Sequence, residues 1–246
     1  MTWHDLLFAH WPMDADALRP HLPSLLEVDT FGGSAWIGVV PFRMSGIRLR
    51  RLPPIPTARA LPELNVRTYV RGGGLPGVWF FSLDAASRLV VWTARAWYGL
   101  PYHHAEMECT ETDEGIRYRS RRHGVGNGRV HAAGPGGVRA RGGGDAPRRR
   151  EARFRAVYGP AGPASPAETG GLEHFLVERY RLFSRGRSGE LRRAEIRHEP
   201  WPLRPAEAEI EVNTVAEASG ISLPGGEPLL HFARRVEVRA WSPEPL

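Results

Sequence analysis

Polar and apolar residues alternate along much of the chain, and the alternation is most regular over residues 63–71. A two-residue period is that of a β-strand, whose successive side chains point to opposite faces. One face of this segment is apolar and is expected in the core: Leu64, Val66, Thr68 and Val70. The other face is polar, with side chains about 6.7 Å apart: Glu63, Asn65, Arg67 and Tyr69. This polar face either meets solvent or lines a pocket.

The same alternation predicts further strands in the rest of the chain. They cover residues 3–11, 34–44, 78–83, 102–110, 116–122, 152–158, 191–198, 206–212 and 229–241. Pro41 lies inside the strand expected at 34–44. Because proline has no N–H to donate to a ladder, it suggests an edge strand or a bulge at this position.

Helical spacing occurs in four places. The longest helix is expected over residues 85–97, where the spacing of Leu89, Trp92 and Ala96 predicts one buried face. Shorter helices are expected after a cap at Asp14 or Asp16, over residues 172–177, and from Asn213 to residue 219.

Two segments lack a regular period. Residues 50–62 are rich in proline, and residues 124–150 are rich in Gly and Arg and predict an irregular hairpin. A chain of 246 residues can bury a sizeable core. Many strands with only a few short helices favour one mostly β domain over residues 1–246, built as an antiparallel barrel or a pair of packed sheets.

Composition indicates a protein of the cytoplasm. There is no run of about eighteen apolar residues of the kind that crosses a membrane, and Asp5 stands where a secretory signal would carry basic residues. The single Cys109 permits no internal disulfide and fits a reducing compartment.

All 33 basic Lys and Arg residues are arginine, because the chain contains no lysine. Most of these arginines alternate along strands, as Arg117, Arg119 and Arg121 do, which is typical of a solvated outer face. A nucleic-acid surface usually interleaves basic residues with aromatic ones for stacking. We therefore do not expect a nucleic-acid partner.

Several short motifs resemble those of the YqjF-like family, uncharacterised bacterial proteins of the acetoacetate decarboxylase-like superfamily. The motifs are LFAHWP at 7–12, LP at 22–23, VVPF at 39–42, PELNVRTYV at 62–70, FSLDA at 81–85, YGLPY at 98–102, ERY at 178–180 and HEPWPL at 198–203. The resemblance spans nearly the whole chain. It implies an α+β, mostly β fold, a conical antiparallel β-barrel with a few short peripheral helices around a small-molecule cavity.

The resemblance also implies a chemistry that this chain lacks. In acetoacetate decarboxylase a Gly-x-Pro segment precedes lysines, one of which forms a Schiff base with a β-keto acid. Here Gly99-Leu100-Pro101 is followed by Tyr102 and His103. An arginine guanidinium stays protonated and cannot form an imine, so decarboxylation through a lysine Schiff base is excluded.

If the fold transfers, the polar face of the strand at 63–71 points into the cavity. Glu63 and His103 are then the candidates for proton transfer. The candidate ligand-binding residues are Asn65, Arg67, Tyr69, Arg95 and Tyr102. Either arginine could hold a carboxylate in bidentate geometry, or form a buried ion pair with Glu63 or Asp84. Glu63 would need a raised pKa to act as an acid or base, and a nearby arginine would oppose that.

His103 and His104 are adjacent on a strand, so at most one of them can enter the pocket. The histidines and Cys109 show no metal-ligand spacing, and we expect no metal. The glycines at 124–128 lack the spacing of a dinucleotide loop, and no Gly-x-Ser-x-Gly motif is present, so no cofactor is expected and serine hydrolysis is unsupported.

Two functions remain open. The first is a lyase or isomerase that acts on a small, anionic organic acid without a Schiff base. The second is a non-catalytic protein that binds or senses a small molecule in the same cavity. Exposed strand edges would also allow a homodimer.

Overall fold

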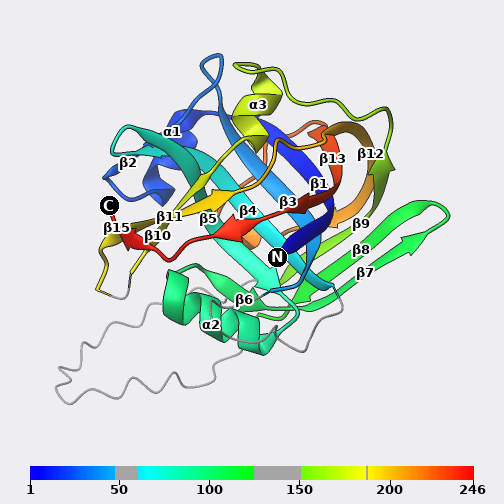
Figure 1. Ribbon diagram of the computed structural model, residues 1–246, viewed down its shortest axis with the longest axis horizontal. Helices are drawn as coiled ribbons and strands as arrows, with labels where there is room; N and C mark the ends of the chain where they lie inside the picture. The colour runs from blue at the N-terminus through cyan, green and yellow to red at the C-terminus, as the bar shows by residue number, and fades with distance from the viewer. Residues whose placement is uncertain (48–59, 125–150, 187) are drawn as a thin grey trace.

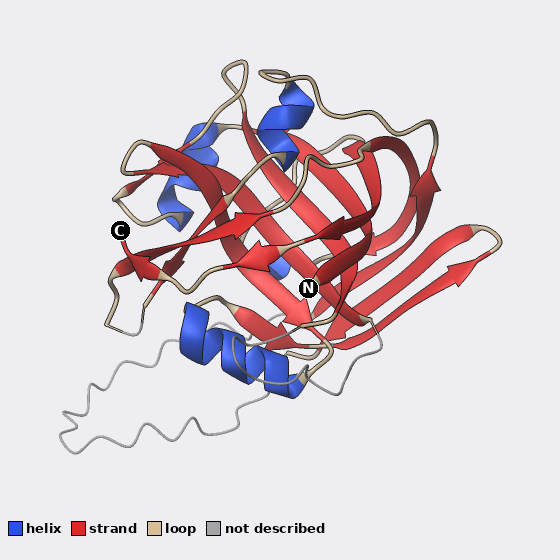
Figure 2. Ribbon diagram, in the orientation of Figure 1, coloured by secondary structure: helices blue, strands red, loops and turns tan. Residues whose placement is uncertain are grey.

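The computed structural model describes residues 1–47, 60–124, 151–186 and 188–246, and most of them lie in strands (Figures 1 and 2). The strands are β1 (Thr2–Met13), β2 (Leu26–Val28), β3 (Ala35–Ser45), β4 (Leu61–Gly72), β5 (Leu75–Ala85), β6 (Tyr102–His104), β7 (Glu106–Thr112), β8 (Gly115–Arg122), β9 (Ala152–Pro160), β10 (Arg181–Arg185), β11 (Leu191–Arg197), β12 (Arg204–Asn213), β13 (Leu229–Glu237), β14 (Arg239–Ala240) and β15 (Glu244–Pro245).

The helices are short and lie at the periphery of the sheet (Figure 2). They are α1 (Ala15–Leu18), α2 (Arg88–Tyr98) and α3 (Leu172–Val177), with 3-10 turns at η1 (Arg19–His21) and η2 (Glu217–Ser219). Of the two caps that the sequence allowed, Asp14 is the one that caps α1, by accepting the Asp16 N–H. Within the described ranges, none of these helices is long and apolar enough to cross a membrane.

The described strands form one curled sheet with an open strand order. Its main path is β14-β11-β10-β5-β4-β3-β1-β13-β12-β9-β8-β7. Neighbouring strands are antiparallel except where β5 pairs with β10 and with β6. The mostly β fold with few short helices is therefore confirmed, whereas the described strands do not close into a barrel.

Strand β4 lies in the middle of this path, between β3 and β5 (Figure 1). Its apolar residues Leu64 and Val66 belong to a core that β7, β8, β9 and β12 help to enclose. Its opposite face belongs to a second core, which includes Tyr69 and residues of α2, α3 and β10. Glu63 and Asn65 are also buried, so the polar face of β4 is enclosed by protein rather than exposed to solvent.

Of the two alternatives that Pro41 suggested, an edge strand is excluded, because β3 pairs with β1 on one side and β4 on the other, and a bulge is found. The irregularity lies opposite Pro41, in β1, where the register shifts between His4 and Ala9. Asp5 lies in this shift and has a φ of +52°. The extra residue of β1 accommodates a position in β3 that cannot donate a hydrogen bond.

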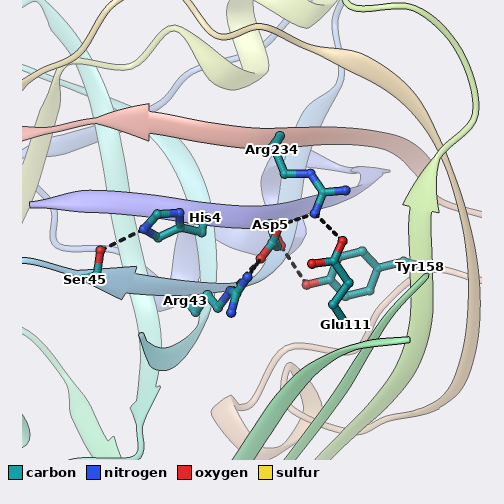
Figure 3. A network of polar contacts seen from close by, with 7 residues as sticks. All are labelled: His4, Asp5, Arg43, Ser45, Glu111, Tyr158 and Arg234. Carbon is teal, nitrogen blue, oxygen red and sulfur yellow. Dashed lines mark hydrogen bonds and ion pairs between the residues drawn. The ribbon is translucent and has the colours of Figure 1, made fainter. Parts of the chain in front are cut away.

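A network of polar contacts holds this bulge in place (Figure 3). The buried Asp5 carboxylate accepts hydrogen bonds from Arg43 Nε at 2.5 Å and Arg234 Nη1 at 2.9 Å. The Asp5 carbonyl accepts the Tyr158 hydroxyl at 2.8 Å. Arg234 also contacts the exposed Glu111 at 3.1 Å. The conformation of Asp5 is therefore fixed by partners on three other strands.

Helix α2 buries a different face from the one that the sequence predicted. Ser87 caps its start and Gly99, with a φ of +64°, ends it. Val90 and Val91 are buried, whereas Leu89 and Trp92 are 53% and 69% exposed. The helix carries two apolar stripes, and packing against its neighbours, rather than the period alone, selects the stripe that contains the valines.

Smaller differences concern the ends of elements. The strand expected at 102–110 is divided into β6 and β7, and the one at 229–241 into β13 and β14. Asn213 is the last residue of β12 and caps no helix, and only the 3-10 turn η2 follows it. The irregular segment at 50–62 and the hairpin at 124–150 fall mostly outside the described residues.

The bulge network predicts a large effect from the loss of one charge. The variant Asp5→Asn keeps the size of the side chain and tolerates a positive φ, but leaves Arg43 and Arg234 without their buried carboxylate. We expect its free energy of unfolding to fall by roughly 2 kcal/mol. Urea denaturation at pH 7 measures this, with the exposed Glu111→Gln as the matched control, expected within about 0.5 kcal/mol of the parent. Equal losses in the two variants would contradict this account.

Candidate functional site

The candidate site is the polar row on β4: Glu63, Asn65, Arg67 and Tyr69. Residues that pair directly across neighbouring strands point to the same face of a sheet. Gly38 of β3 pairs with both His10 of β1 and Arg67, so these two side chains meet above the glycine. A Cβ at position 38 would lie 3.0 Å from the His10 ring and 3.5 Å from Arg67 Cγ. The missing side chain of Gly38 therefore makes room for both residues.

One end of the row is acidic. The Tyr102 hydroxyl donates a hydrogen bond to Glu63 Oε2 at 2.7 Å, and both side chains are buried. Burial raises the pKa of Glu63 to about 8, with the charge of Asp84 adding to the rise and the Tyr102 hydrogen bond opposing it. Burial and the adjacent Glu63 also raise the pKa of Tyr102 well above its usual value. At pH 7 this end of the row therefore holds a protonated carboxyl group beside a neutral phenol.

The opposite face of the sheet holds a separate ion pair. Asp84 pairs with Leu64 in the ladder, and so points away from Glu63. Its Oδ1 lies 3.3 Å from Arg122 Nη1. Burial raises the pKa of Asp84 to about 6, while the charge of Arg122 lowers it. The arginine that pairs with Asp84 is therefore Arg122, and neither Arg67 nor Arg95.

The other end of the row is cationic. The Arg67 guanidinium carbon lies 5.5 Å from the centroid of the Phe8 ring and 5.8 Å from that of Tyr69. Its Nη2 donates a long hydrogen bond of 3.4 Å to the Leu176 carbonyl. Across the described residues, no carboxylate lies within 4.0 Å of Arg67. The buried ion pair with Glu63 that the sequence allowed is thus absent, and this explains how the pKa of Glu63 can be raised.

A neutral histidine stands beside this arginine. His10 Nε2 and the Tyr69 hydroxyl form a hydrogen bond of 2.6 Å inside the protein. Burial, followed by the charges of Arg67 and His231, lowers the pKa of His10 well below 6.5. Burial also raises the pKa of Tyr69. Both rings are therefore uncharged at neutral pH, and Arg67 supplies the positive charge at this end.

A second arginine closes the wall above Tyr69. Arg179 forms a buried ion pair of 2.7 Å with Asp29, and its guanidinium carbon lies 4.1 Å from the Phe175 ring centroid and 5.1 Å from that of Tyr69. Because Arg179 already has its carboxylate, it supports the wall of the site, and Arg67 is the one of these two arginines that has no carboxylate among the described residues.

Several buried polar atoms on this face have no hydrogen-bond partner within the described part of the chain. They include Asn65 Oδ1, Arg67 Nε, His10 Nδ1 and His231 Nδ1. Phe8, which lies on the same face as His10, pairs with His231 of β13, so the four side chains lie in neighbouring rows. Buried polar groups in proteins are nearly always paired. Four such atoms on one face are the donors and acceptors that a bound polar molecule would need.

The structure brings together five of the seven residues predicted from the sequence: Glu63, Asn65, Arg67, Tyr69 and Tyr102. The other two lie elsewhere. His103 pairs with Asp84, on the face away from Glu63, and Arg95 is exposed on α2. His103 therefore cannot share the site of Glu63. In the part of the chain that the structure describes, no three His, Cys, Asp or Glu side chains form a set that could hold a metal ion.

His10 and His231 join the site although the sequence did not single them out for it. His10 follows Phe8 at the spacing of one strand face, which is a signal that the chain does contain. The spacing alone does not assign His10 to the site. The register does, because it places His10 opposite Gly38 and next to the polar row.

Solved structures share this fold. Acetoacetate decarboxylase from Legionella pneumophila matches with a TM-score of 0.60 and 13% identity, covering 100% of this chain and 86% of that one. The enduracididine biosynthesis enzyme MppR, complexed with pyruvate, matches with a TM-score of 0.60 and 12% identity, covering 99% and 88%. At this identity the likeness concerns the fold alone, which is that of the acetoacetate decarboxylase-like proteins.

Sequence comparison is more specific. The family DUF2071, described as "Uncharacterized conserved protein", matches residues 1–237. The uncharacterized protein YqjF of Bacillus subtilis is 45% identical over 240 residues, which are 98% of this chain and 89% of that protein. The chain therefore belongs to the DUF2071 family, and the resemblance inferred from its motifs is confirmed.

The raised pKa of Glu63 predicts a specific dependence of stability on pH. The folded pKa of about 8 exceeds the unfolded value of 4.5, so the folded protein holds a proton that the unfolded chain releases. The free energy of unfolding should therefore fall as the pH rises from about 4.5 to 8, by as much as about 5 kcal/mol from this group.

The variant Glu63→Gln cannot lose a proton and should lack this contribution, while its amide oxygen can still accept from Tyr102. Urea unfolding of both proteins at pH values from 5 to 9 measures the difference. We expect the variant to gain stability relative to the parent as the pH rises. Two parallel curves would show that the Glu63 carboxyl titrates normally.

Proposed function

We propose that this protein is an enzyme that transfers protons on a small anionic organic acid, as a lyase or isomerase, without a Schiff base. The observation that carries the proposal is a buried carboxyl group with a pKa of about 8 on the same strand face as an arginine that lacks a carboxylate partner among the described residues. A proton donor and acceptor at one end and a fixed cation at the other are what such a reaction requires.

Glu63 is the proposed acid and base. With a pKa of about 8, roughly a tenth of the group is ionised at pH 7. The ionised form would take a proton from a carbon next to a carbonyl group and leave an enolate. The protonated form would return it, to the neighbouring carbon in an isomerisation or to the departing group in an elimination. Tyr102, which donates a hydrogen bond to Glu63 Oε2, would orient the carboxyl group and stabilise it when it is ionised.

Arg67 is the proposed anion-binding residue. Its Nε has no described partner, and the adjacent His10 is neutral, so the charge available to a carboxylate is that of the guanidinium. Asn65 lies between Arg67 and Glu63 on the strand and can donate to, or accept from, the middle of the substrate. The Cα atoms of Glu63 and Arg67 are about 13 Å apart, and the proposed substrate would lie between the two side chains, over Asn65.

The comparisons support a small acid of this kind. MppR, which shares the fold, has been solved with pyruvate. The present chain contains no lysine, so a substrate bound here would have to react without an imine. Enolisation by a general base satisfies that condition, because it needs no covalent bond between protein and substrate.

The alternative is a protein that binds an organic acid without converting it. The unpaired polar atoms of Asn65, Arg67 and His10 favour binding and do not by themselves require turnover. A sensor of this kind would use the same Arg67 but would not depend on the proton of Glu63.

Deuterium exchange separates the two functions, because binding alone does not break a bond between carbon and hydrogen. Pyruvate is incubated with the protein in D2O, and the loss of its methyl proton signal is followed by NMR. We expect the parent to accelerate exchange and Glu63→Gln to slow it by about a hundredfold or more. Arg67→Met should raise the pyruvate concentration needed for half-saturation by about tenfold, because it removes a charge-assisted contact.

Glu111→Gln, which alters an exposed carboxylate on β7 that pairs with Arg234, is the matched control and should exchange at the parent rate. Full exchange in Glu63→Gln would remove the acid–base role. Binding of pyruvate that needs Arg67 but gives no exchange would establish the binding protein instead.

A further inference from the structure

A second candidate site lies in the sheet itself, along the edge of β5 that faces β10 and β6 rather than β4. Strand β10 pairs with β5 only at Val78 and Trp79, and β6 pairs with β5 only from Leu83 onward. Residues 80–82 of β5 lie between these two partners. The register of β4 and β5 also shifts at this point, which makes Phe81 a bulge residue. A cavity of about 330 Å³ occupies this interruption.

Four Trp and Phe residues line the cavity. They are Trp79, Phe80, Phe81 and Phe183. Three consecutive aromatic residues of β5 are only partly buried, although their strand lies in the interior of the sheet. Gly99 closes another side, where a Cβ would clash with the Arg185 carbonyl oxygen. The α2–β6 connection can therefore pack this closely on β10 only with glycine at position 99.

The polar groups of the cavity are suited to an anion. Arg185 lines it, shares a face of β10 with Phe183, and forms no ion pair with a described carboxylate. None of the described lining residues is acidic, and His21, which lies edge-on to Phe81, adds a further nitrogen donor or acceptor.

We propose that this cavity binds a small aromatic carboxylate. The ring would lie among Trp79, Phe81 and Phe183, and the carboxylate would accept hydrogen bonds from Arg185, which lies on the same face of β10 as Phe183. The volume is at the lower end of the range of small-molecule sites, which suits one or two fused rings. The site shares no residue with the polar row on β4, so it is a second ligand site rather than part of the proposed reaction centre.

Isothermal titration calorimetry with 2-naphthoate tests this proposal. The parent should bind it, and should bind 2-naphthalenemethanol, which lacks the carboxylate, at least about tenfold more weakly. We expect Arg185→Gln to weaken naphthoate binding by about tenfold. Trp79→Leu should weaken the binding of naphthoate and of the alcohol to a similar extent, because it removes an aromatic contact with the ring and no charge.

Two controls locate the bound molecule. Arg239→Gln removes another exposed arginine, on the short strand β14, and should leave binding unchanged. Arg67→Met should also leave naphthoate binding unchanged, because Arg67 belongs to the other site. The proposal is overturned if the parent does not bind naphthoate at millimolar concentration, if the alcohol binds equally well, or if Arg67→Met abolishes binding while Arg185→Gln does not.

Discussion

Protein encloses strand β4 on both faces, and this enclosure determines the state of every polar side chain on it. A strand between two cores would ordinarily be apolar throughout, because an unpaired polar group removed from water costs about 1–3 kcal/mol. Here one face is apolar, and the other carries a carboxyl, an amide, a guanidinium and a phenol. The Tyr118 hydroxyl reaches from the apolar side to the Glu63 carbonyl at 2.7 Å, so the strand is anchored from the face opposite the site.

The same enclosure gives the two ends of the row opposite properties. At one end no cation of the described residues lies close to Glu63, so burial keeps its proton on up to a pH of about 8. At the other end Arg67 keeps its charge, and burial together with that charge keeps His10 neutral. Separation along the strand is what preserves this difference, since an arginine in contact with Glu63 would lower its pKa. Gly38 contributes because it has no side chain, which leaves room for His10 and Arg67 to lie side by side.

The sequence predicts strand β4 and the fold, but it predicts only some of the side chains that share the site. The two-residue period identified β4 and both of its faces, and the family motifs identified the fold. The period could not place His103, because the face of a short strand follows from its register with β5. It could not place Arg95 either, because α2 has two apolar stripes and the surrounding packing selects the one with Val90 and Val91.

Pro41 and His10 show the same limit. Pro41 indicated an irregular ladder, but only the pairing of β3 with β1 shows that the bulge lies at Asp5, in the other strand. His10 became a site residue because the register sets it against Gly38 of β3, the neighbouring strand in the sheet. Local patterns therefore predict elements and their faces, and contacts between distant strands decide which polar residues share a site.

The proposed chemistry requires that Glu63 holds a proton at neutral pH inside the protein. Carbon-13 NMR of protein labelled at the glutamate side-chain carboxyl measures this directly, with Glu63→Gln to assign the resonance. We expect one carboxyl that titrates near pH 8 and is missing from the variant. If every glutamate carboxyl of the folded parent titrates below about pH 5.5, as unperturbed groups do, this requirement is not met.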